Sequence, residues 1–127
     1  MTQEERIELL KQVAEVAPEG CRGEYRDLPY ETVVLKIDRG DTERWIALEL
    51  YDEYEDAEAI IAMLDAIQAK EDKSWVRLGY YPDIAQSPYN VVVYYESPDG
   101  LFIRESEGFG ATRAEAVARA FVEVFSK

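Results

Sequence analysis

The sequence contains no histidine and only one cysteine, and these two absences remove most of the common catalytic chemistries. Without histidine there is no Ser-His-Asp or Cys-His nucleophile, no histidine acid or base, and no histidine metal ligand. The lone thiol of Cys21 forms no internal disulfide and supports no zinc or iron–sulfur site. We therefore expect no enzyme activity, no cofactor and no metal.

Long apolar runs and phosphate-binding loops are also missing. No stretch approaches the roughly 20 apolar residues that span a bilayer, and the first residues are polar and acidic, unlike a signal peptide. The stretch Gly108-Phe109-Gly110 precedes a helical pattern but lacks the third glycine and the Lys-Ser/Thr ending of a phosphate-binding loop. We expect a cytoplasmic protein that contacts no membrane.

The charge is strongly one-sided. There are 27 acidic and 14 basic residues, which give a formal net charge of −13. Such a chain repels nucleic acid and anionic membranes, so we expect its partner to be a protein and not nucleic acid itself. The same acidity favours a soluble monomer, although an exposed strand edge rich in tyrosine could pair into a weak homodimer.

The chain has 127 residues, which is the size of one domain spanning residues 1–127. Apolar residues recur with helical spacing in residues 2–16, in residues 55–69, and from residue 112 nearly to the end. Thr2 with Glu5, and Thr112 with Glu115, have the spacing of capping boxes, which place the starts of the first and last helices. We find no internal repeat, linker or low-complexity segment.

Strand patterns occupy much of the remaining chain. They cover residues 32–37, 44–50, 75–81, 90–96 and 101–105. We expect residues 19–30 to form a loop and residues 107–110 to form a flexible joint. The resulting order, α-β-β-α-β-β-β-α, predicts an α+β domain with a single, mostly antiparallel sheet of about five strands and three helices packed on it.

The second half of the chain has a further pattern. A helix over residues 54–69 precedes three strands, a glycine joint and a last helix that opens with Ala-Thr-Arg-Ala-Glu-Ala-Val-Ala-Arg-Ala at residues 111–120. This arrangement resembles the phage alpha-beta-alpha sandwich domain family, whose members tend to end in a Thr-x-x-x-Ala-x-x-x-Ala helix. The resemblance implies a phage or prophage origin, a bacterial host cell and an α/β/α sandwich, and it supplies no catalytic residues.

One stretch, residues 45–69, contains acids but neither lysine nor arginine. A carboxylate-based hydrolase would use such acids directly or as ligands for Mg²⁺. Their spacing does not match a calcium-binding loop, which needs alternate acidic positions and a central glycine. A helix start also favours acids for its own stability. If they share one surface, they would imitate DNA phosphates. The candidate partner-binding acids are Glu49, Asp52, Glu53, Glu55, Asp56, Glu58 and Asp65.

Nine tyrosines are the other notable group. Four of them, Tyr80, Tyr81, Tyr94 and Tyr95, lie on neighbouring predicted strands and could form a stacking platform. A platform for bases needs a basic groove, which this chain lacks, so we expect packing at the edge of the core or a protein interface. We predict a small acidic phage-type accessory protein that acts as a protein-binding module. The alternative is an anti-defence inhibitor that mimics DNA and blocks a host nucleic-acid-binding protein.

Overall fold

The chain folds into three helices and six strands, seen in a computed structural model that describes residues 1–51, 55–70 and 74–126. The described elements are α1 (Gln3–Val16), β1 (Cys21–Arg26), β2 (Thr32–Arg39), β3 (Thr42–Leu48), α2 (Ala57–Lys70), β4 (Ser74–Tyr80), β5 (Tyr89–Glu96), β6 (Phe102–Gly110) and α3 (Arg113–Phe125). The order α-β-β-β therefore occurs twice before the last helix. This repeat of architecture was not predicted from the sequence.

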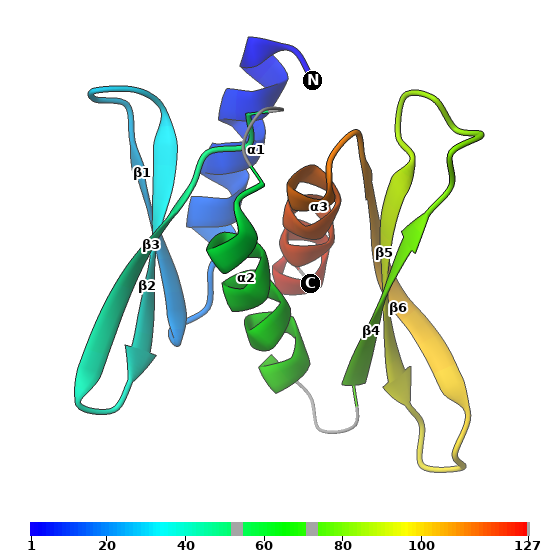
Figure 1. Cartoon of the computed structure of the whole chain (residues 1–127). Coiled ribbons are helices and arrows are strands. Elements are labelled where there is room, and N and C mark those ends of the chain that lie inside the picture. The colour runs from blue at the N-terminus through cyan, green and yellow to red at the C-terminus, as the bar shows by residue number, and fades with distance from the viewer. Residues whose placement is uncertain (52–54, 71–73, 127) are drawn as a thin grey trace.

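The strands form two separate antiparallel sheets, with the orders β1-β2-β3 and β4-β5-β6. We call them the N-terminal sheet and the C-terminal sheet. Figure 1 shows the helices as a layer between the two sheets, with α1 against the first sheet and α3 against the second. The α+β class is confirmed, but the single five-stranded sheet is wrong, and the layer order differs from the α/β/α sandwich that the phage resemblance implies. Helix α2 connects β3 to β4 and contacts both, and in this arrangement the two strands belong to different sheets.

The loop expected at residues 19–30 is also a wrong prediction, because it contains strand β1. This strand pairs along its whole length with β2. Cys21 is buried against the core, whereas its neighbour Arg22 is exposed, and exposed residues alternate with more covered ones along the strand. The charged residues that suggested a loop lie on the solvent side of an edge strand, where charge is common.

The glycines expected to form a flexible joint lie inside strand β6 and pack directly on α3. A Cβ atom on Gly108 would collide with the Ala116 carbonyl oxygen and would lie 2.5 Å from the Ala120 amide nitrogen. A Cβ atom on Gly110 would lie 2.7 Å from the Ala116 amide nitrogen. Strand and helix backbones therefore touch here because neither side presents a large side chain.

The predicted starts of the first and last helices are confirmed. The Thr2 hydroxyl accepts a hydrogen bond from the Glu5 amide at 3.1 Å, and the Thr112 hydroxyl accepts one from the Glu115 amide at 3.1 Å. In each case the side chain satisfies an amide that the helix itself leaves without a partner. Within the ranges that the structure describes, no helix has the length and apolarity needed to cross a membrane.

The core lies where the helical layer meets the inner faces of both sheets. Strand β5 is the central strand of its sheet, as its apolar pattern on both faces predicted. The largest fully buried side chains come from all three helices and from β2, β3 and β5. They are Phe121, Leu10, Leu35, Leu48, Met63, Ile67, Val13, Val33, Val91, Val93, Val117 and Val124.

Candidate functional site

Large apolar side chains that remain exposed are concentrated on the C-terminal sheet and its loops. Of the 14 large apolar residues that are exposed in the described chain, nine lie between residues 75 and 109. These nine are Trp75, Leu78, Tyr80, Tyr81, Ile84, Leu101, Phe102, Ile103 and Phe109. Single exposed apolar residues are ordinary, but a group of them on one face is typical of a binding surface, and those of this sheet are divided between its two faces.

Three of the aromatic rings of this sheet form a contact group on its outer face. Trp75 pairs with Tyr94 across β4 and β5, and their rings are stacked at 4.6 Å with an interplanar angle of 19°. The Phe102 ring of β6 meets the Trp75 ring edge-on at 5.4 Å. We call these three residues the aromatic cluster. The inner face of β5 carries the buried Val91 and Val93, so alternation along the strand directs the cluster away from the helices.

The aromatic cluster is accessible to a partner. Trp75 is 38% exposed and Phe102 is 56% exposed, while Leu101 at the adjoining turn is 63% exposed. The next row across the sheet holds Arg77, Val92 and Glu107. Val92 is buried at 3% exposure, although it lies on the outer face. The outer face therefore combines an apolar centre with a few charged residues beside it, which is the composition of many protein interfaces.

The outer face of the N-terminal sheet has a different character. Its central row aligns Arg22, Lys36 and Trp45 across three strands. The Lys36 amine lies 4.1 Å from the centre of the Trp45 ring, and the Arg26 guanidinium lies 5.5 Å from it. Cation–π contacts therefore involve this tryptophan, although the residue is still 50% exposed. The two outer faces therefore differ. The C-terminal sheet carries three contacting rings, whereas the N-terminal sheet carries one ring beside two cationic side chains.

Two of the predicted partner-binding acids are used within the fold. The Asp56 carboxylate accepts hydrogen bonds from the backbone amides of Glu49 at 3.1 Å and Leu50 at 3.0 Å. Burial raises the pKa of Asp56, and these two backbone hydrogen bonds oppose that rise. The Glu49 carboxylate accepts a hydrogen bond from the Tyr30 hydroxyl at 2.9 Å. Asp56 thereby joins the start of α2 to the backbone that follows β3, and Glu49 joins the same backbone to the loop between β1 and β2.

The other predicted acids are placed separately. Glu55, Glu58 and Asp65 are exposed, and Glu58 forms an ion pair with Arg44 at 2.9 Å. Asp52 and Glu53 lie outside the described residues. The structure thus brings Glu49 and Asp56 together through the chain's own contacts. A single acidic surface made by all seven residues stays a prediction.

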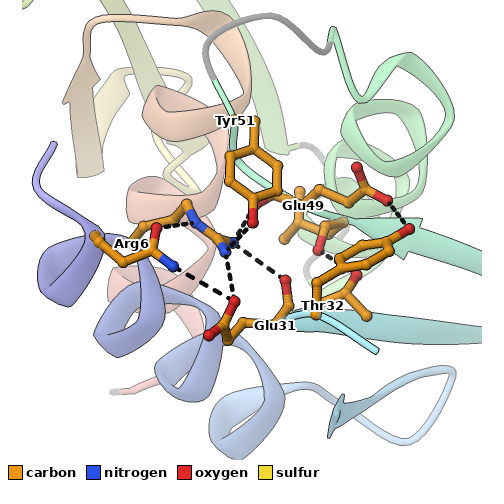
Figure 2. Close-up of polar contacts among 8 residues, drawn as sticks. Arg6, Glu31, Thr32, Glu49 and Tyr51 are labelled. Atoms are coloured by element: carbon orange, nitrogen blue, oxygen red, sulfur yellow. Dashed lines mark hydrogen bonds and ion pairs between the residues drawn. The ribbon is translucent and has the colours of Figure 1, made fainter. Parts of the chain in front are cut away.

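The buried residue Arg6 forms the densest polar group, shown in Figure 2. It is 3% exposed, and its Nε donates to the Gln3 side chain. One terminal nitrogen donates to the backbone carbonyls of Glu31 and Glu49, and the other donates to the Glu31 carboxylate and the Tyr51 hydroxyl. These contacts use all five N–H groups of the guanidinium, so Arg6 has no donor left for a ligand. The group therefore holds α1 to two loops.

The lone cysteine is also part of the packing. Cys21 is 3% exposed, and burial raises the pKa of its thiol from 9.0 to about 11. The thiolate is the reactive form of a cysteine. At pH 8 the fraction of Cys21 present as thiolate should therefore be about a hundredfold smaller in the folded chain than in the unfolded chain. We expect a disulfide reagent at pH 8 to modify Cys21 at least that much faster in urea than in buffer. Equal rates in the two solutions would contradict this placement.

Within the parts of the chain that the structure describes, no group of three or more cysteine, aspartate or glutamate residues is arranged to hold a metal ion. No protein-family model matches this chain, and neither a curated protein nor a solved structure is significantly similar to it. The phage resemblance therefore stays a prediction, and the geometry of the surface carries the functional argument.

Sequence reasoning singled out Tyr94 but not Trp75 or Phe102. The four tyrosines considered as a platform do not share one face. Tyr94 pairs with Trp75 on the outer face, whereas Tyr80 contacts Tyr89 on the inner face, with ring centres 4.9 Å apart. The alternation of residues 74–80 separates Trp75 from the face of Val76 and Leu78, but it does not give the register that sets Trp75 beside Tyr94.

Proposed function

We propose that this chain is a protein-binding module that docks a partner protein on the outer face of its C-terminal sheet. The observation that carries this proposal is the exposed aromatic cluster of Trp75, Tyr94 and Phe102. We propose no catalytic role. The phage or prophage origin and the bacterial cytoplasm belong to the same proposal, and both derive from the sequence resemblance alone.

The energetics favour an apolar partner surface. Burying an exposed aromatic side chain against a partner stabilises the complex by about 25 cal/mol for each Å² of apolar surface covered. Tryptophan and tyrosine also lose little conformational entropy on binding, and they are enriched where interfaces bind most strongly. A partner that presents an apolar patch would cover Phe102 and Leu101, which are both more than half exposed.

Capture experiments with matched variants test this proposal. Tagged wild-type protein is used to capture partners from bacterial lysate, beside the variants Phe102→Lys and Trp45→Lys. We expect Phe102→Lys to weaken binding of a captured partner about tenfold or more, because it places a charge in an apolar contact. Trp45→Lys adds the same charge to the other sheet and should leave that binding unchanged. Equal loss in the two variants, or retention in both, would refute the proposed surface.

The DNA-mimic alternative predicts a different pattern. It places binding on acids, of which Glu55, Glu58 and Asp65 are exposed among the described residues. Binding would then weaken steeply as salt rises, because exposed charges are screened. The double variant Glu58→Gln with Asp65→Asn would also lose the partner. Apolar docking on the C-terminal sheet predicts that binding persists in high salt and in this double variant.

A further inference from the structure

A groove lies on the opposite, inner face of the C-terminal sheet, between β4, β5 and the start of α3. It has a volume of about 410 Å³, and its lining includes Leu78, Tyr80, Tyr89, Val91 and Arg113. A second hollow of about 330 Å³ shares Tyr89 and Arg113 and reaches Ile60 of α2. Volumes of this order are typical of pockets for small molecules.

The groove has apolar walls that the core does not fill. Leu78 and Tyr80 are on the same face of β4 as the partly buried Val76, yet they are 48% and 58% exposed. The Tyr80 ring lies 4.9 Å from the Tyr89 ring, so the two rings form one continuous wall. Beside them the buried Val91 contributes to the floor. An apolar ligand placed here would cover surface that the fold leaves in water.

One cation faces this apolar space. The Arg113 guanidinium lies 5.9 Å from the centre of the Tyr89 ring, and it forms no ion pair with any described residue. Arg22 and Arg77 also lack an ion pair within the described chain, but both belong to the outer faces of the sheets. Arg113 instead lines a hollow.

We infer that this groove binds a small apolar carboxylate, such as a medium-chain fatty acid. Its carboxylate pairs with Arg113, and its apolar body lies along Leu78, Tyr80 and Tyr89. The linings of the two hollows decide which of them holds the ligand. The lining of the first hollow includes no acid, whereas the lining of the second includes Glu55, which repels a carboxylate. This site is independent of the proposed docking surface, because the two lie on opposite faces of the sheet.

Backbone amide NMR titrations of the whole chain with three probes of equal chain length test the inference. Octanoate should shift the amide signals of groove residues such as Tyr89 and Val91 and saturate. Octanol should bind at least about tenfold more weakly, and octylamine more weakly still, because only the carboxylate pairs with Arg113. Shifts of equal size with octylamine, or shifts confined to the aromatic cluster, would overturn the inference.

Two pairs of variants separate the charge from the wall. Arg113→Gln should reduce octanoate affinity about tenfold, to the level of octanol, whereas Arg22→Gln should not change it. Leu78→Asp should abolish octanoate binding, whereas Leu28→Asp, at a residue 80% exposed outside the groove, should preserve it. A short apolar peptide with a free terminal carboxylate is the competing source of the same chemistry. If it saturates the groove and octanoate does not, the small-ligand inference is wrong.

Discussion

Replacing Gly108 with alanine is expected to destabilise the fold by roughly 3 kcal/mol or more, which is at the upper end for an overpacked core. The added methyl group would overlap the Ala116 carbonyl oxygen and lie 2.5 Å from the Ala120 amide nitrogen. Both atoms belong to the backbone of α3, so no side-chain rotation relieves the overlap. Strand β6 and helix α3 would have to separate. Urea unfolding followed by circular dichroism measures the change.

Gly20→Ala is the matched control. A Cβ atom at this position meets nothing within 4 Å, and the backbone there has no positive φ. The substitution should change the free energy of unfolding by less than about 1 kcal/mol, with stabilisation expected because alanine restricts the unfolded chain. If Gly108→Ala were as stable as Gly20→Ala, the close packing of β6 on α3 would be wrong.

Replacing Arg6 with methionine is expected to cost roughly 3 kcal/mol of stability, because it leaves buried acceptors without donors. The guanidinium holds two backbone carbonyls, at 3.2 and 2.6 Å, which the methionine side chain cannot satisfy. The Glu31 carboxylate retains contact with water, so its share of the loss is smaller. Urea unfolding measured by tryptophan fluorescence would report the change.

Two further variants give this prediction its controls. Arg22→Met removes an exposed arginine and should change the free energy of unfolding by no more than about 0.5 kcal/mol. Glu31→Gln retains an oxygen that accepts from Arg6 and should cost less than Arg6→Met. An Arg6→Met protein as stable as Arg22→Met would show that the network in Figure 2 contributes nothing to stability.

Local patterns predicted most of the elements. Both capping boxes and the apolar periodicity of the helices gave their positions, and the five predicted strands are present. Strand β1 was missed because it is short and charged on its solvent side, between Cys21 and Arg26. Its pairing with the neighbouring strand β2 is made by backbone hydrogen bonds, which the pattern of side chains along β1 does not report.

The division into two sheets also depends on long-range contacts. Turn chemistry predicts that neighbouring strands pair, but it does not decide whether β3 and β4 share a sheet. The role of Gly108 was missed for a similar reason. A glycine in a sequence usually indicates a flexible backbone, whereas Gly108 allows the backbone of α3 to pack closely on β6.

The candidate site was only partly accessible from the sequence. The acids of residues 45–69 were predicted to bind a partner because they are close together in the chain, but Glu49 and Asp56 make contacts within the fold. The aromatic cluster draws Trp75, Tyr94 and Phe102 from three different strands. Which face of that sheet stays exposed depends on where α3 packs, and that is settled only by the tertiary structure.

The most direct test of the proposed docking surface is hydroxyl-radical footprinting of the chain with and without a captured partner, analysed by mass spectrometry. This method reports the solvent exposure of individual aromatic side chains. Docking on the C-terminal sheet predicts that oxidation of Trp75 and Phe102 falls in the complex while oxidation of Trp45 is unchanged. Protection of Trp45, with Trp75 and Phe102 oxidised as before, would contradict it.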